Sequence, residues 1–392
     1  MKKYINITFF VGLIFTVFSI HICKVGSSIV YNLENTAITM PDKLINIKNA
    51  YEDVTVFESE WINIYGLSQR MLGKRTIEEF TIYKDKRGKL QRTQEALSEE
   101  EVADIVENLD KFYAYLAKKE IPMYYVAMVL PVESADDVLQ GIEDYSFVNA
   151  KSQEEQLTAT EIPIINLRHS EKMGKIGRGG EKFYKTDHHW TMQTNFTAFG
   201  DIIERVEEDL GWNLCADDFT NLEKYEIFVK EECFLGSFGI KAGKYYAGKD
   251  DFVIYLPKVD TVYTFEEYDS NGDLVQTKEG NFKEALIDWN LIMDDKYNNK
   301  YNAFSNQGSV ENRFINHSAL NDKKVLLISH SYGRPLSMYL SLCFGELRNI
   351  DLQEGRFKGD IVAYIEEYNP DLVIVMTECE GVIAGKITME KR

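Results

Sequence analysis

Residues 324–333 read KVLLISHSYG, and this stretch decides the fold class. Residues 325–329 form a strand-length, almost wholly apolar run, which predicts a strand buried on both faces of a sheet. Ser331 follows in a turn, and residues 334–344 are expected to form a helix. Residues 361–368 predict another helix and residues 371–377 a final buried strand. The C-terminal part of the chain therefore alternates helix and strand, as an α/β fold does.

The same alternation occurs earlier in the chain. Ser98 and Glu101 have the spacing of a capping box, which marks the start of a helix. Apolar residues at helical spacing follow it, namely Val102, Ile105, Val106, Leu109, Phe112, Tyr113 and Leu116. Residues 123–130 are then a nearly continuous apolar run that predicts a second buried strand.

We divide the chain into a signal anchor or signal peptide (residues 1–28), a stalk and packing segment (residues 29–74) and a large α/β domain (residues 75–392). Within the domain, residues from about 213 to 300 are polar and β-rich. The run Asp269-Ser270-Asn271-Gly272 inside them is a strong hairpin-turn signal. We predict that this region is an insertion or lid on the main sheet.

The N-terminus points to an extracytoplasmic location. Lys2 and Lys3 precede an apolar stretch that continues to Ile22 and is long enough for a membrane helix, which needs about 20 residues. The lysines would stay on the cytoplasmic side, so the remainder of the chain would lie outside. An uncleaved anchor is the first interpretation and a cleaved signal peptide the alternative.

Composition excludes several classes of protein. A hydrophobic content of 44% is enough for a core, so a disordered chain is not expected. The formal charge of −19 argues against nucleic acid and anionic membrane surfaces as partners. The five cysteines show neither CxxC spacing nor metal-like clustering.

Asp187 and His189 are the first candidate catalytic residues. They lie two positions apart in FYKTDHHWT, so on an extended segment both side chains point to the same side. A carboxylate beside an imidazole fixes its tautomer and stabilises the imidazolium that forms when the ring takes a proton. His188 is expected to point the other way and receives no chemical role. A metal-ligand set and ordinary loop residues remain the alternatives.

Ser331 is the candidate nucleophile. A serine hydroxyl needs a base within hydrogen-bond reach before it can attack a carbonyl. The strand-turn-helix pattern places it at the carboxyl end of a sheet, where α/β proteins build their sites. The Ser331 N–H would lie near a helix N-terminus and could stabilise an oxyanion. The simpler alternative is an N-cap serine.

Together these segments resemble the DHHW family, which is related to the alginate-type O-acetyltransferases. The resemblance is carried by TDHHWT at residues 186–191 and LLISHSYG at residues 326–333. The run FLGSFG at residues 234–239 is similar to the FxGSLG run of the family, and residues 370–375 resemble its final strand. The resemblance implies an SGNH-hydrolase-like three-layer sandwich with a permuted motif order.

The resemblance also implies roles for single residues. Ser331 matches the nucleophile, His189 the base and Asp187 the orienting acid. Tyr332, Gly333 and Trp190 are candidates for the oxyanion site or pocket. His330 departs from the family pattern, which usually has an aspartate at this position.

The implied reaction is acetyl transfer through an acetyl-serine to a hydroxyl of a cell-surface polysaccharide. A membrane-bound O-acyltransferase would be the donor partner, and neither a metal nor an organic cofactor is expected. Two alternatives remain open: a carbohydrate O-acetylesterase with the same three residues, and a membrane-anchored glycan-binding or assembly protein without catalysis.

Overall fold

The computed structural model describes residues 58–78, 81–294, 299–304, 310–352, 357 and 361–377, together with residues 19 and 30. Contacts divide the chain into two units, Met1–Tyr65 and Gly66–Arg392. The predicted anchor and most of the predicted stalk lie outside the described residues. Among the described residues, no helix has the length and apolar character needed to cross a membrane.

The domain is built on an eight-stranded mixed sheet with the order β5-β4-β13-β11-β12-β10-β8-β9. The first five strands run parallel, and each of the last three is antiparallel to the strand before it. In the same order the strands span Ile164–Asn166, Met123–Ala127, Leu372–Thr377, Lys324–Ser329, Glu346–Ile350, Glu311–Asn316, Tyr263–Tyr268 and Leu274–Gly280.

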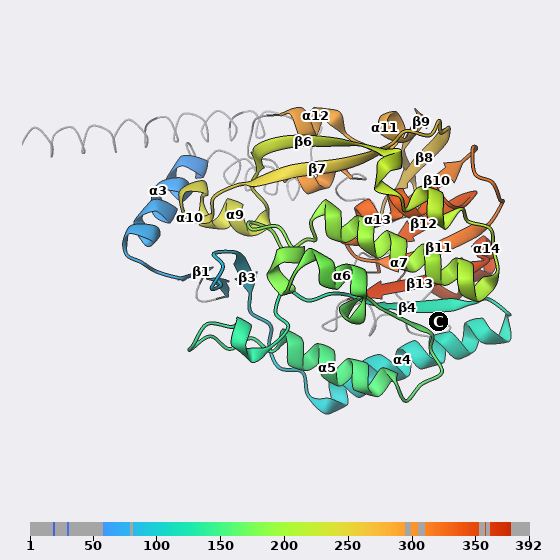
Figure 1. Cartoon of the computed structure of the whole chain (residues 1–392), viewed down its shortest axis with the longest axis horizontal. Helices are drawn as coiled ribbons and strands as arrows, with labels where there is room; N and C mark the ends of the chain where they lie inside the picture. The colour runs from blue at the N-terminus through green and yellow to red at the C-terminus, as the bar shows by residue number, and fades with distance from the viewer. Residues whose placement is uncertain are drawn as a thin grey trace, which may run out of the picture. The chain divides into compact units, whose positions relative to one another are not determined.

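Helices cover both faces of this sheet (Figure 1). Side chains alternate along β11, so Val325 and Leu327 join one apolar cluster and Leu326 and Ile328 join another. The first cluster includes α7 (Met192–Leu210) and α13 (Gly333–Leu340). The second includes α4 (Glu99–Lys118) and α14 (Ile361–Tyr368). The predicted mixed α/β fold is therefore confirmed, with a central strand buried on both faces.

The capping box predicted the start of α4 correctly. Ser98 Oγ accepts a hydrogen bond from Glu101 N at 3.2 Å, and the Glu101 carboxylate accepts one from Ser98 N at 2.8 Å. The predicted strand at residues 123–130 is too long, because β4 ends at Ala127. Among the described residues, its pairing with β13 and β5 extends to Thr377 and Asn166, which both lie opposite Ala127. The helix predicted at residues 334–344 likewise ends early, at Leu340.

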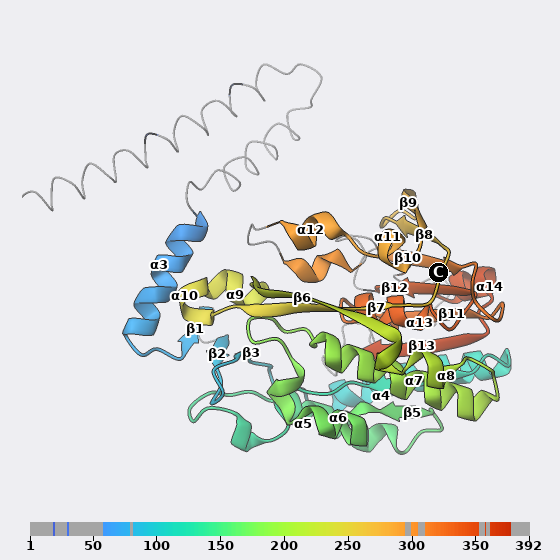
Figure 2. The same cartoon turned by 45° about the horizontal axis from the view of Figure 1, so that its top comes forward.

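Two smaller sheets accompany the main one. The strands β1, β2 and β3 form a three-stranded antiparallel sheet, and β6 and β7 pair as a long arm that reaches toward α9 and α10 (Figure 2). These elements span Thr76–Ile77, Ile82–Lys84, Leu90–Arg92, Tyr225–Phe234, Asp250–Pro257, Ser237–Ala242 and Lys244–Ala247. The region from residue 213 to residue 300 thus supplies the β6–β7 pair and also two strands of the main sheet, β8 and β9.

The remaining helices are short and lie on connections. They are α3 (Glu58–Met71), α5 (Ser146–Leu157), α6 (Glu171–Ile176), α8 (Ala216–Phe219), α11 (Phe282–Ala285) and α12 (Trp289–Met293), with the 3-10 helices η2 (Ala135–Asp137), η3 (Leu167–His169), η4 (Gly179–Lys182), η5 (Leu222–Lys224) and η6 (Lys300–Ala303).

Candidate active site

Ser331 lies in the turn between β11 and α13, at the carboxyl end of the parallel strands. The turn is closed by hydrogen bonds from Gly333 N to His330 O at 2.8 Å and from Arg334 N to Ser331 O at 3.2 Å. Gly333 is required here because a Cβ at this position would lie 1.8 Å from Ser329 Oγ. The close approach holds α13 over the strand end and leaves Ser331 half-buried.

Asp187 and His189 lie on a bent loop just before α7. Tyr184 N donates to His189 O at 3.1 Å, which closes the loop on itself. Thr191 then caps α7 by accepting a hydrogen bond from Thr194 N at 3.3 Å. Both candidate residues are buried, so the loop presents them toward the interior of the domain.

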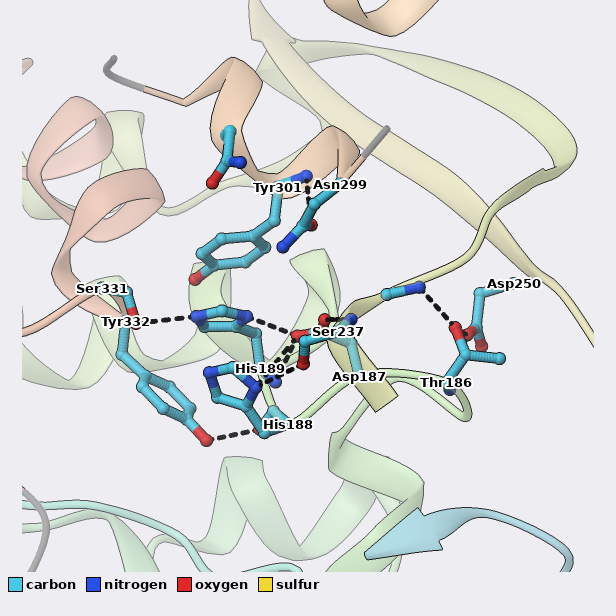
Figure 3. Close-up of polar contacts among 12 residues, drawn as sticks. Thr186, Asp187, His188, His189, Ser237, Asp250, Asn299, Tyr301, Ser331 and Tyr332 are labelled. Carbon is cyan, nitrogen blue, oxygen red and sulfur yellow. Dashed lines mark hydrogen bonds and ion pairs between the residues drawn. The ribbon is translucent and has the colours of Figure 1, made fainter. Parts of the chain in front are cut away.

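The structure brings Asp187, His189 and Ser331 together, although 142 residues separate the histidine from the serine (Figure 3). His189 Nε2 is 2.8 Å from Ser331 Oγ. On the other side of the ring, Nδ1 is hydrogen-bonded to Asp187 Oδ1, which also accepts from His189 N at 2.9 Å. The imidazole is therefore oriented by a carboxylate at one nitrogen and faces a hydroxyl at the other.

The FLGSFG run explains why the Asp187 side chain cannot move. Ser237 N donates to Asp187 Oδ2 at 2.5 Å. A Cβ on Gly236 would lie 2.2 Å from Asp187 Cβ, so only glycine allows this approach. Behind the pair, Thr186 Oγ1 accepts from Gly236 N at 2.9 Å and donates to Asp250 Oδ2 at 2.7 Å. A run that the sequence linked to the site only by resemblance thus contacts the carboxylate directly.

Electrostatics favour an ionised Asp187 and a neutral His189 in the resting site. Burial alone raises the pKa of the Asp187 carboxyl, but attraction to His189 and the hydrogen bonds it accepts hold that pKa well below its ordinary value. Burial lowers the pKa of His189, and the neighbouring His188 lowers it further, against the opposing effect of Asp187. A neutral ring that donates from Nδ1 to the carboxylate keeps Nε2 as an acceptor for the Ser331 hydroxyl.

Two rings hold the His189 imidazole between them, and sequence reasoning missed both. Tyr301, in η6, stacks on it with the ring centroids 3.7 Å apart and the planes at 12°. His188 packs against the other side at 3.8 Å and 36°. The expectation that His188 points away is wrong, because the backbone bends here instead of being extended.

Tyr301 also carries a buried hydroxyl without a hydrogen-bond partner among the described residues. Figure 3 shows this hydroxyl directed toward the side of His189 on which Ser331 lies. A buried polar group without a partner is costly, and this one lies beside the His189–Ser331 pair.

The other candidate pocket residues are engaged within the protein. The Gly333 N–H donates to His330 O at 2.8 Å, and its role at the oxyanion site or pocket stays a prediction. The Tyr332 hydroxyl donates to His188 O. Trp190 is buried and packs edge-on against Tyr332 with centroids 5.4 Å apart. Tyr332 and Trp190 thus support the loop that carries the histidines.

Asp187, His188 and His189 also form the one group within the described part of the chain that could hold a metal ion, with ligand atoms within 4.8 Å of one another. His189 already uses Nδ1 for Asp187 and Nε2 for Ser331. A metal on this histidine would therefore have to replace one of those two contacts.

Two cavities meet at His188. The larger has a volume of about 690 Å³ and lies between the β1–β3 sheet and α9, with Ser237 and His188 in its wall. The smaller, of about 130 Å³, is bordered by His188, Phe238 and Tyr332. Arg92, His188 and Phe238 line both cavities, and among them His188 is the neighbour of the candidate base.

No protein-family model matches the sequence, and no curated protein matches it either. Solved structures do match. PatB1 of Bacillus cereus is 18% identical over 78% of this chain and 99% of its own, with a TM-score of 0.60. A second structure of PatB1, with a sulfonyl adduct, is 15% identical over 79% of this chain and 97% of its own, with a TM-score of 0.59.

A DHHW family protein from Eubacterium siraeum matches 78% of this chain and 93% of its own at 15% identity, with a TM-score of 0.58. The fold of the chain is thus shared with PatB1 and with a DHHW family protein, which agrees with the resemblance seen in its sequence motifs.

Proposed function

We propose that this chain is an O-acetyltransferase that carries the acetyl group on Ser331. The observation that carries the proposal is the hydrogen-bonded series Asp187, His189 and Ser331, with 2.8 Å between His189 Nε2 and Ser331 Oγ. A hydroxyl that donates to a neutral, carboxylate-oriented imidazole is the arrangement that activates serine for acyl transfer. The resemblance to the DHHW family supplies acetyl as the acyl group.

In the first half of the reaction, Ser331 Oγ attacks the carbonyl carbon of the acetyl donor. His189 Nε2 takes the hydroxyl proton, and Asp187 stabilises the imidazolium that forms. The tetrahedral intermediate then breaks its bond to the donor oxygen, which leaves with the proton from His189. The product is acetyl-Ser331.

In the second half, an acceptor hydroxyl gives its proton to His189 and its oxygen bonds to the acetyl carbon. The bond to Ser331 Oγ breaks, and the serine recovers the proton. In both halves a negative charge develops on the carbonyl oxygen. The Ser331 N–H, in the turn before α13, and the Tyr301 hydroxyl are the groups best placed to stabilise it.

The proposal includes the setting of the reaction. The apolar segment after Lys3 would hold the chain at the outer side of a membrane, and a membrane-bound O-acyltransferase would supply the acetyl group. The acceptor would be a hydroxyl of a cell-surface polysaccharide. These features come from the N-terminal sequence and from the family resemblance.

An O-acetylesterase would use the same three residues with water as the acceptor. A cavity of about 690 Å³ beside His188 fits either reaction, because the esterase would bind an acetylated sugar and the transferase a free one. A glycan-binding protein without catalysis would not need the serine at hydrogen-bond distance from an oriented imidazole.

The test uses the full-length chain in detergent, with one sample incubated with p-nitrophenyl acetate and a separate sample with a sulfonyl fluoride. Wild type should gain one acetyl group by intact mass and should be labelled by the sulfonyl fluoride, as PatB1 can hold a sulfonyl adduct. Ser331→Ala should gain neither, and Ser329→Ala, at the end of β11, should keep both. A chelator should change nothing. If wild type stays unmodified, or the Ser331→Ala variant is acetylated equally, the proposal fails.

A further inference from the structure

His188 is placed differently from the histidine beside it. His189 is buried and has both ring nitrogens engaged, whereas the His188 side chain is 40% exposed. Its Nδ1 lies 2.9 Å from Ser237 Oγ, and the Tyr332 hydroxyl holds its carbonyl. No described residue hydrogen-bonds to His188 Nε2. One nitrogen is thus bonded within the protein, and the residue itself lines both cavities.

The larger cavity has the chemical character of a sugar site. Its wall combines the hydroxyls of Thr81, Thr93 and Ser237 with the aromatic ring of Phe238. Hydroxyl groups can pair with sugar hydroxyls, and an aromatic ring can pack on the apolar face of a pyranose. Its volume of about 690 Å³ is within the range of small-molecule sites.

The charged side chains that line the same cavity indicate which kind of sugar it would bind. Arg92 and Lys241 line the cavity together with the acidic residue Glu95, and Lys241 Nζ also lies 4.0 Å from the exposed carboxylate of Glu78. Two cations at one cavity contrast with the formal charge of −19 of the whole chain. A ligand with a negatively charged substituent would complement them.

We infer that this cavity binds the acceptor sugar and that Arg92 and Lys241 hold an anionic group of that sugar. His188 Nε2 then donates or accepts a hydrogen bond at the sugar, beside the hydroxyl that is to be acetylated. The inference rests on the proposed function. Because His188 packs at 3.8 Å on the face of His189, at whose edge Ser331 lies, a sugar bound to His188 reaches the acetyl group. His188 therefore positions the acceptor, while His189 moves the proton.

The experiment separates acylation from transfer. The full-length chain is acetylated with p-nitrophenyl acetate, and acylation is followed by release of p-nitrophenol. Methyl glucuronide or methyl glucoside is then added, and the fraction of acetyl groups that reaches the sugar instead of water is measured. Wild type should transfer to both sugars and should have the lower KM for the glucuronide.

Two variants test the inference, and one is the matched control. His188→Gln should slow acylation, because the ring that packs on His189 is lost, and should in addition raise the acceptor KM about tenfold or more, since one hydrogen bond to the sugar is lost. Arg92→Gln, at the exposed rim, should remove the preference for the glucuronide. His317→Gln is the control, because this histidine lies outside both cavities and bonds to Thr264 Oγ1 at 2.9 Å.

The outcomes are distinguishable. If wild type forms no acetyl-Ser331, the proposed function fails and the inference fails with it. If acetyl-Ser331 forms but His188→Gln and Arg92→Gln partition acetyl between sugar and water as wild type does, the inference alone is overturned. A His188→Gln variant that acylates slowly but has an unchanged acceptor KM would also overturn it, because the role of the ring would then be to support His189.

Discussion

Replacing Asp187 by asparagine tests whether the charge of this side chain, and not its shape, makes His189 a base. The carboxylate accepts three hydrogen bonds, from Ser237 N at 2.5 Å, from His189 N at 2.9 Å and from His189 Nδ1. Asparagine has almost the same size, but it has one acceptor oxygen and an amide that donates. The asparagine side chain can therefore accept a hydrogen bond from Ser237 N or from His189, but not from both.

Both orientations of the new amide impair the reaction. With its oxygen toward Ser237, its NH₂ group faces His189 Nδ1, the ring must carry its proton on Nε2, and it cannot accept the Ser331 proton. With its oxygen toward His189, the tautomer is kept but the Ser237 N–H faces a donor, and the imidazolium loses its counter-charge. We expect acylation to slow by about 10³–10⁴-fold, which is about 4–5.5 kcal/mol of transition-state stabilisation. The free energy of unfolding should fall by about 1–3 kcal/mol.

The assay is the p-nitrophenol burst, measured alongside thermal unfolding of the same sample. Asp144→Asn is the matched control, because Asp144 is also buried and accepts from Tyr83 Oη at 2.8 Å and Ser146 N at 3.0 Å. It should lose comparable stability and keep its acylation rate within about twofold. An Asp187→Asn variant that folds and acylates within about tenfold of wild type would refute the reasoning.

Three further outcomes follow from the geometry. Gly236→Ala would place a Cβ 2.3 Å from Asp187 Oδ2 and should reduce the acylation rate about 100-fold. Gly174→Ala is the control, because its Cβ would lie in open space, and equal acylation rates in the two variants would contradict the role of the Gly236 contact. Because burial lowers the pKa of His189, the ring stays unprotonated as the pH falls through the ordinary histidine value of about 6.5. The acid limb of a pH–rate profile should therefore lie below that value, and a limb at or above it would contradict a lowered His189 pKa. Tyr301→Phe should slow acylation about 10–100-fold without lowering the melting temperature, since its hydroxyl has no hydrogen-bond partner among the described residues. An unchanged rate would remove this hydroxyl from the oxyanion site.

Local sequence signals predicted those parts of the fold that depend on neighbouring residues. The start of α4 follows from Ser98 and Glu101, whose side chains bond each other's backbone. The position of Ser331 follows from the apolar run of β11 and the turn after it. The length of β4 could not be predicted from its own residues, because its apolar run continues to Leu130 whereas its pairing with described strands extends only to Ala127.

The site shows the same division. Asp187 and His189 were readable because they are two residues apart and bond each other. Ser237 lies 50 residues from Asp187, and its backbone N–H could be assigned to the carboxylate only once the fold brought the FLGSFG run beside it. Tyr301 lies in a short 3-10 helix without any sequence motif, and its stacking on His189 is purely tertiary.

The bend at residues 185–189 changes what the DHHW motif can do. On an extended strand, the side chains of adjacent histidines would point to opposite sides, and one of the two rings would lie away from Asp187. On the bend, both rings lie beside Asp187, with Nδ1 of His188 3.7 Å from the carboxylate that bonds His189. One ring can then be buried as a base while the other stays half-exposed at the cavities. An attacking water and an attacking sugar hydroxyl both need His189 as the base, but the sugar has further groups that His188 can bind, so His188 is the residue at which hydrolysis and transfer should differ.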